Sequence, residues 1–180
     1  MRFTFFSCVV IAGCATAGSG TSPRPATETV RVATGGVGTN LRIGNDDAVA
    51  VRKVAGTPDI VFRLLPLILD SLGIPVNSVD AAKHTIGNTG FNIRGKLKGV
   101  PLSRYIECGG ATQMGPNADS YSINFQFIVE VKPDKEGSAL VTTLQAMGKP
   151  INFAQDYSPC GSKGNLENRL SEMVAAKLPH

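Results

Sequence analysis

The chain has 180 residues, of which 42% are hydrophobic and 18% are charged, and its formal net charge is +4. This composition is typical of a globular protein and too apolar for a disordered one, and the length suits one domain with one core. The small positive charge, spread without a dense basic cluster, argues against a nucleic-acid partner. No stretch reaches the roughly 20 apolar residues that a permanent transmembrane helix needs.

The N-terminus has the organisation of an export signal. Arg2 supplies one positive charge, and the apolar run from Phe3 to Ala12 includes only Thr4 and Ser7 as polar residues. A charged start followed by an apolar run of this length is typical of a signal peptide.

The tetrad Ile11-Ala12-Gly13-Cys14 at the end of this run resembles the lipobox of bacterial lipoproteins, with Ile in place of the usual Leu. The resemblance implies that residues 1–13 are a lipoprotein signal peptide and that Cys14 becomes an acylated N-terminus, held in the membrane by its lipid. In this resemblance, Ala15 after the cysteine, rather than Asp, implies the outer membrane. We expect the protein to face the periplasm, although the sequence does not distinguish the inward from the outward orientation. The alternative is cleavage before Gly18, after Ala15-Thr16-Ala17, which would release a soluble exported protein.

Residues 14–27 contain small residues and two prolines without apolar periodicity, which predicts a flexible tether. The remainder, 28–180, is predicted to be a single α+β domain. A glycine-rich stretch at 34–38 is not expected to bind phosphate, because a strand rather than a helix follows it. Short strands are expected at 29–33, 41–43 and 48–54.

The first helix is expected to open at Thr57 as N-cap, with Pro58 in the first position, and to end at Gly73. Pro66 is predicted to kink it, because proline removes a backbone hydrogen bond. Its apolar face at helical spacing comprises Val61, Leu64, Leu65, Ile68 and Leu72.

Strands are expected next at 76–86 and 91–97, then a short helix at 102–108 and a loop at 109–118. Strict alternation predicts a strand at 121–131, and a turn at 133–137 returns the chain as a strand at 139–147. After an irregular stretch at 151–159, Asn165 is expected to cap a final amphipathic helix. The elements together predict an α+β fold, a mostly antiparallel sheet with two amphipathic helices packed on one face.

The cysteines indicate one disulfide. Cys8 would leave with the signal peptide and Cys14 would carry the lipid, so Cys108 and Cys160 remain as a pair in an oxidising compartment. Their bond would stabilise the fold by about 4 kcal/mol in the chain-entropy model. The alternative is two separate buried thiols.

No catalytic, metal or cofactor site is predicted. A Ser-His-acid site would need His84, which has no nucleophile motif nearby, and His180 is the only other histidine. A zinc site lacks ligands, and Asp46-Asp47 is predicted to be a solvated turn rather than a calcium loop.

One pattern of basic residues stands out. Arg94, Lys96 and Lys98 alternate along an expected strand, which would place them on one face, and Arg104 follows. They could hold a phosphate, an anionic lipid headgroup or an acidic partner. The interpretation we favour from sequence is a solvated strand face whose charges discourage edge pairing.

The expected function is that of a lipid-anchored periplasmic protein acting as a non-enzymatic binding or scaffolding module in envelope assembly. The expected architecture is similar to that of accessory lipoproteins of outer-membrane assembly machines, an analogy at the level of the fold alone. The partners would be the membrane, through the N-terminal lipid, and an envelope protein or anionic lipid. The alternative is a small exported hydrolase or ligand carrier, which would need a concave site with converging polar groups.

Overall fold

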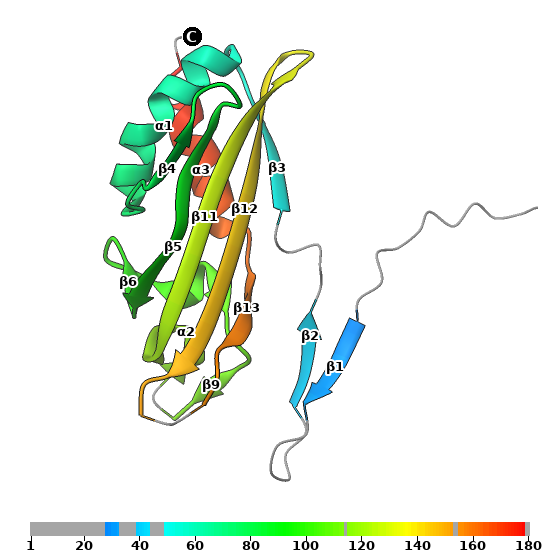
Figure 1. Cartoon of the computed structure of the whole chain (residues 1–180), viewed down its shortest axis with the longest axis vertical. Helices are drawn as coiled ribbons and strands as arrows, with labels where there is room; N and C mark the ends of the chain where they lie inside the picture. Colours follow the sequence, from blue (N-terminus) through cyan, green and yellow to red (C-terminus); the bar gives the residue numbers. More distant parts are fainter. Residues whose placement is uncertain (1–27, 33–38, 44–48, 114, 153–154, 179–180) are drawn as a thin grey trace, which may run out of the picture.

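The computed structural model describes residues 28–32, 39–43, 49–113, 115–152 and 155–178. In these residues an antiparallel sheet of seven strands packs against two helices, α1 (Pro58–Leu72) and α3 (Asn165–Ala175) (Figure 1). The predicted α+β class is confirmed. The predicted signal peptide, Cys14 and the tether lie outside the described residues, as do the stretches 34–38 and 44–47.

The main sheet has strands from both halves of the chain. They are β3 (Val49–Val54), β4 (Ser78–Asp80), β5 (Thr85–Arg94), β8 (Ile106–Glu107), β11 (Tyr121–Asp134), β12 (Gly137–Pro150) and β13 (Ser158–Ser162). Their order is β4-β5-β11-β12-β13-β8, with β3 also paired to β12. Two further strands, β1 (Glu28–Val32) and β2 (Thr39–Ile43), pair with each other as a separate two-stranded sheet.

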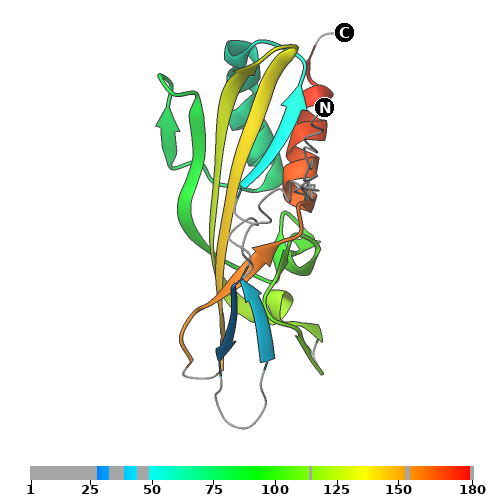
Figure 2. The same ribbon diagram turned by 90° about the vertical axis from the view of Figure 1, so that its right-hand side faces the viewer.

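The hairpin of β11 and β12 runs along the long axis of the molecule (Figures 1 and 2). Every residue of β11 has a partner in β12, from Tyr121 opposite Pro150 to Asp134 opposite Gly137. The alternating stretch at 121–131 is thus a strand as predicted, but both strands are longer. The charged residues near the turn continue the ladder because cross-strand pairing, which local composition does not report, holds them there.

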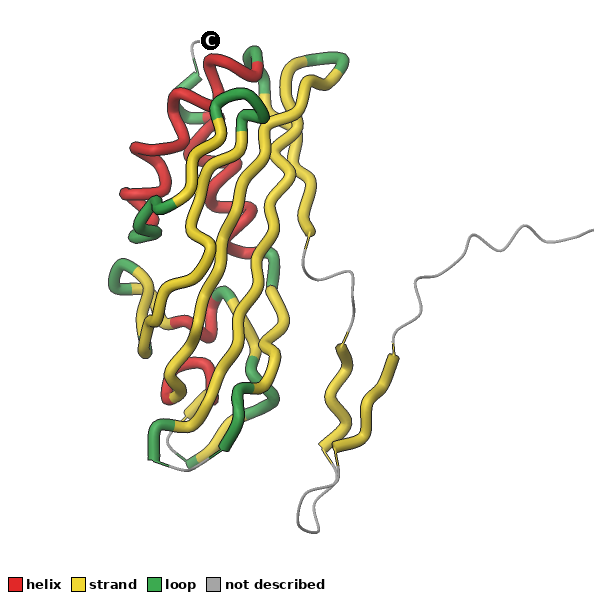
Figure 3. The backbone as a smooth tube through the Cα atoms, viewed as in Figure 1, coloured by secondary structure: helices red, strands yellow, loops and turns green. Residues whose placement is uncertain are grey.

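The far edge of β12 is shared by two strands. β3 pairs with residues 138–143 and β13 pairs with residues 146–148, both antiparallel to β12 (Figure 3). The stretch at 151–159 was expected to be irregular, yet β13 begins inside it, at Ser158. Its composition gives little strand signal, and the pairing with β12 decides its conformation.

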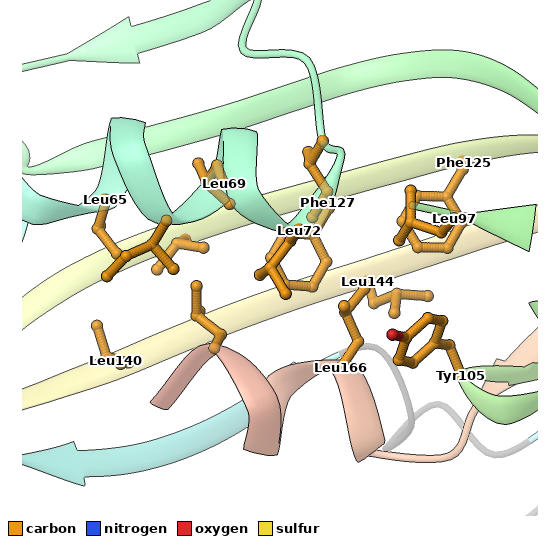
Figure 4. Close-up of a cluster of buried hydrophobic side chains, with 14 of the residues drawn as sticks. Leu65, Leu69, Leu72, Leu97, Tyr105, Phe125, Phe127, Leu140, Leu144 and Leu166 are labelled. Atoms are coloured by element: carbon orange, nitrogen blue, oxygen red, sulfur yellow. The ribbon is translucent and has the colours of Figure 1, made fainter. Parts of the chain in front are cut away.

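The core lies between the sheet and the helices. Alternate residues of β11 from Ile123 to Val131 are buried on the helix side, as the alternation predicts. Figure 4 shows where the elements meet, with Leu65, Leu69 and Leu72 from α1, Phe125, Phe127, Leu140 and Leu144 from the long strands, and Leu166 from α3.

The two helices begin and end close to the predicted positions. Thr57 is the N-cap residue of α1, although its side chain makes no capping bond, and Gly73 ends the helix in the left-handed conformation. For α3 the N-cap residue is Gly164, so the prediction of an Asn165 cap is wrong. The Asn165 amide instead donates to the carbonyl of Arg104 at 2.7 Å, which connects the start of the helix to the end of the 3-10 helix at residues 102–104.

β5 joins parts of the two strands predicted at 76–86 and 91–97, because it continues through Gly87-Asn88-Thr89-Gly90, which was expected to be a turn; the turn lies instead at 81–84, between β4 and β5. The pairing to β11 shifts register between Phe125 and Phe127, so this stretch forms a bulge. The Asn88 side chain accepts from the N–H of Gly90 at 2.7 Å and donates to the carbonyl of Pro75. Turn-forming residues here shape a bulge inside a strand.

The stretch after β5 differs most from the sequence prediction. A small hairpin, β6 (Lys96–Leu97) with β7 (Val100–Pro101), is followed by the short 3-10 helix η1 (Leu102–Arg104) and β8, where one helix was expected at 102–108. Three further short elements, β9 (Ala111–Thr112), β10 (Gly115–Pro116) and α2 (Asn117–Ser120), occupy the predicted loop. The pairing of β8 with β13 accounts for the strand in place of helix.

Candidate functional site

The predicted disulfide is present. Cys108 and Cys160 are bonded, with an S–S distance of 2.04 Å and Cα atoms 4.3 Å apart. The bond ties the loop after β8 to β13 and excludes the alternative of two free thiols in this structure. Cys108 is therefore not available as a nucleophile.

A hollow of about 280 Å³ lies beside this disulfide. Its volume is slightly below the range of roughly 300–1,000 Å³ that is usual for small-molecule pockets. The lining is largely apolar or small, and consists of Ser103, Ile106, Glu107, Cys108, Gly110, Ala111, Pro116, Ala118 and Lys163.

Two polar residues of the hollow are engaged with protein groups. The Ser103 hydroxyl donates to Asp119 Oδ2 at 2.7 Å, and the Lys163 ammonium donates to the Ser103 carbonyl at 2.8 Å. The serine has no base beside it in this arrangement, because a hydroxyl bonded to one carboxylate without histidine lacks the usual acyl-transfer relay. The geometry fits a structural junction between η1, α2 and the short connection from β13 to α3.

His84 lies away from the hollow. It was expected in a strand, but it occupies the turn between β4 and β5 with a positive φ of 48°. Its Nε2 is 3.0 Å from Asp59 Oδ1, and its ring meets Phe62 edge-on at 5.3 Å between centroids. These contacts join the turn to the start of α1, so His84 does not converge with Ser103 or Lys163.

The four basic residues singled out in the sequence are all exposed. They do not alternate along one strand, because β5 ends at Arg94 and Gly95 turns the chain with a φ of 68°. Lys96 lies in β6, Lys98 in the turn of the hairpin and Arg104 at the end of η1. We call Arg94, Lys96, Lys98 and Arg104 the basic cluster; its role in binding stays a prediction.

The sheet has a second face, turned away from the helices, which we call the outer face. In the ladder, Val51 of β3 lies opposite Val141 of β12, and Val49 lies opposite Thr143, which is itself opposite Ile128 of β11. Val49 and Val51 are each 53% exposed, and the other two apolar residues are half-buried. Val49, Val51, Ile128 and Val141 form the apolar zone of this face.

Four carboxamides lie further along the outer face. Asn92 is opposite Asn124, and Gln126 is opposite Gln145. Within the described part of the chain, none of these side chains makes a hydrogen bond. This amide zone offers donors and acceptors without formal charge beside the apolar zone.

Sequence reasoning did not find the outer face as a site. The pattern of each strand predicts one buried face and one solvated face. For Val49 and Val51 the sequence predicted a strand and nothing about their neighbours. The signal needed was the register, since only the pairing of β3 with β12 brings its valines beside Val141. The contact of Ser103 with Asp119 was missed for a similar reason, because nothing local connects η1 with α2.

Over the described ranges, no group of three or more His, Cys, Asp or Glu side chains is placed to hold a metal ion. The helices within those ranges are also too short or too polar to cross a bilayer. No protein-family model matches the sequence, and a search of curated proteins found no similar one. The candidate site therefore depends on the geometry of the outer face and the basic cluster.

Proposed function

We propose that this protein is a membrane-anchored, non-enzymatic binding module that receives a partner protein of the cell envelope on its outer sheet face. The lipid on Cys14, implied by the lipobox resemblance, supplies the anchor. The observation that carries the proposal is the apolar zone on a face that no described helix covers.

The apolar zone is unusual for a solvated sheet face. The solvated face of an antiparallel sheet commonly carries polar side chains, in alternation with the apolar residues of the buried face. Val49 and Val51 are more than half exposed, yet they lie beside Val141 and Ile128 in one contiguous group. Contiguous exposed apolar surface with a polar rim marks interaction sites, and the amide zone supplies that rim.

The alternative of a small hydrolase or ligand carrier has weaker support. It would use the hollow near Ser103, where the side chains of Ser103 and Lys163 are already bonded to protein groups and which His84 does not approach. Catalysis by general acid and base needs titratable groups converging on one reacting atom. A sheet face with an exposed apolar zone and a polar rim fits protein recognition better.

Site-specific photo-crosslinking tests the proposal. A photoreactive amino acid at Val51 is compared with one at Leu67, which is 58% exposed on α1 and so closely matched in accessibility. The lipidated full chain is irradiated in the membranes of the producing cell. We expect a discrete adduct from Val51 alone, and Val141→Glu on the same chain should remove it. No adduct from Val51, or equal adducts from both positions, would overturn the proposed surface.

The anchor is tested separately. Intact mass of the mature protein should show an acylated N-terminal Cys14, and Cys14→Ser should move the chain from the membrane to the soluble fraction. A mature chain that begins at Gly18 without lipid would instead support soluble export.

A further inference from the structure

We propose that the basic cluster lies against an anionic lipid surface and orients the anchored domain on the membrane. This inference rests on the proposed function, since the anchor on Cys14 keeps the domain beside the bilayer. The fourteen residues 14–27 span at most about 50 Å even when fully extended. The domain therefore stays within reach of the membrane surface, and its charges interact with that surface when they approach to within about 10 Å.

The first argument is the charge of the segment. Residues 81–106 contain five Lys or Arg and no Asp or Glu. Of these five, Lys83 lies 3.6 Å from Asp80, whereas the members of the basic cluster have no ion pair or side-chain hydrogen bond within the described residues. Four exposed cations without protein partners leave their charges free for an anionic surface.

The second argument is that the fold fixes the backbone of the β6–β7 hairpin, which carries Lys96 and Lys98. Leu97 is 2% exposed and packs among the core residues near Phe125, so its side chain holds the β6–β7 hairpin against the core (Figure 4). The N–H of Leu102 donates to the carbonyl of Gly95 at 2.9 Å, which closes the segment at its base. Asp119, whose carbonyl oxygen lies beside Gly95, turns its carboxylate to Ser103 and does not neutralise the cluster.

The third argument is the residue at the tip of the hairpin. Lys98 and Gly99 form a two-residue turn, and both have positive φ values, 47° and 83°. Such a turn prefers Asn, Asp or Gly at both positions, so a lysine at the first costs conformational energy. The chain therefore carries an exposed positive charge where asparagine would serve the turn better.

Lys149 extends the positive surface. Arg94, Ser122 and Lys149 are opposite one another on three neighbouring strands, so both cations lie on the outer face, about 10 Å apart. The Lys149 ammonium lies 4.8 Å from the ring centre of Tyr157. The positive charges thus lie on both sides of the sheet edge, with Arg94 and Lys149 on the outer face and Lys98 beside Gly73 at the C-terminus of α1, so this edge is the part that would meet the lipid surface.

The test uses residues 15–180, which lack the lipid, so the result does not depend on acylation. Co-sedimentation with vesicles of phosphatidylcholine containing a minority of phosphatidylglycerol is compared with vesicles of phosphatidylcholine alone. We expect binding to the anionic vesicles, a loss of about five-fold for each cluster charge removed, and weakening by salt. Equal binding to both vesicle types would overturn the inference. Competition by inorganic phosphate beyond that of chloride at equal ionic strength would assign the cluster to a soluble anion instead.

Two variants distinguish the cluster from net charge. Arg94, Lys96 and Lys98 are replaced together by Gln, and the matched control replaces Lys132, Lys135 and Lys177. Lys132, near the end of β11, and Lys135, in the turn between β11 and β12, lie away from the β6–β7 hairpin (Figure 1). The first variant should lose binding to anionic vesicles and the control should retain most of it. Equal losses of vesicle binding in the two variants would mean that net charge alone causes the binding, and would overturn the assignment of the binding to the basic cluster.

Lys98→Asn separates binding from folding. Asparagine suits the positive φ, so the variant should be at least as stable as the natural chain while binding about five-fold more weakly. Lys98 could instead have a structural role. It lies beside the C-terminus of α1, since a Cβ added at Gly73 would be 3.0 Å from the Lys98 Cβ. A positive charge near a helix C-terminus stabilises the helix. Reduced stability with unchanged binding would establish that role and remove Lys98 from the cluster.

Discussion

The backbone N–H and the hydroxyl of Ser103 both donate to Asp119, at 2.8 Å to Oδ1 and 2.7 Å to Oδ2. Through this pair the carboxylate joins η1 to α2, and the Ser103 carbonyl in turn accepts from Lys163 at 2.8 Å. Hydrogen bonds to Ser103 and Asp119 thus connect η1, α2 and Lys163, which lies between β13 and α3.

Asp119→Ala should destabilise this junction. The substitution leaves the Ser103 N–H and hydroxyl without their acceptor, and bonds to charged groups contribute about 1.5–3 kcal/mol each. We expect the free energy of unfolding in urea to fall by about that amount in total. Asp156→Ala, at an exposed carboxylate, is the control and should change it by less than about 0.5 kcal/mol. Similar effects of both substitutions would mean that the junction contributes little.

The disulfide should contribute more. It closes a loop with a sequence separation of 52 between Cys108 and Cys160. Replacing both cysteines by alanine should lower the free energy of unfolding by up to about 4 kcal/mol, through the larger entropy of the open unfolded chain. Chemical denaturation measures the difference, and reduction of the natural chain should reproduce it. A loss below about 1 kcal/mol would contradict this account.

The fold class was predictable because the strongest signals are local. The alternation of β11 and the apolar stripe of α1 each bury one face, and the caps at Thr57 and Gly73 mark the ends of the helix. These periodicities do not depend on how the elements are arranged. Packing the helices on the sheet is the simplest way to bury the apolar face of each.

The rest depended on contacts that are distant in sequence. β13 and β8 are short and pair with each other, so neither is visible without its partner. The Gly87–Gly90 stretch has turn composition but forms a bulge, because pairing with β11 continues on both sides. The apolar zone required the register of β3 against β12, which no local pattern specifies.

Gly87 should be intolerant of a side chain. A Cβ at this position would lie 2.1 Å from the carbonyl oxygen of Phe127 and 2.8 Å from the Cα of Ile128. Both are backbone atoms of the central strand and cannot give way cheaply, so Gly87→Ala should lower the free energy of unfolding by about 3 kcal/mol.

Gly99→Ala is the control for Gly87→Ala. No atom lies within 4 Å of the added Cβ at Gly99, so the only cost there is the positive φ, about 1 kcal/mol. Thermal or urea unfolding of the two variants separates steric overlap from backbone strain. Equal losses would contradict the close approach of β5 to β11 at the bulge.

The ion pair of Lys53 and Asp134, with 2.9 Å between Nζ and Oδ2, should make stability depend on pH in the acid range. The hydrogen bond from Lys53 is the main reason that the pKa of Asp134 is lowered in the folded protein. Burial opposes it, and the Lys53 charge and the N–H of Lys135 add to it. A carboxyl whose folded pKa lies below its unfolded value of about 3.9 contributes stability that is complete above that pH. This contribution is lost as the pH falls through the folded pKa.

Asp134→Asn should therefore be less stable than the natural chain at neutral pH, and the difference should disappear in acid. Lys53→Met should give the same pattern, because it removes the partner instead of the carboxylate. The effect should be small and should weaken with salt, since the Lys53 side chain is 72% exposed. Urea unfolding over a series of pH values measures it, with Glu136→Gln in the adjoining turn as control. A difference that stays constant down to low pH would show that Asp134 acts through packing or the turn, and not through its charge.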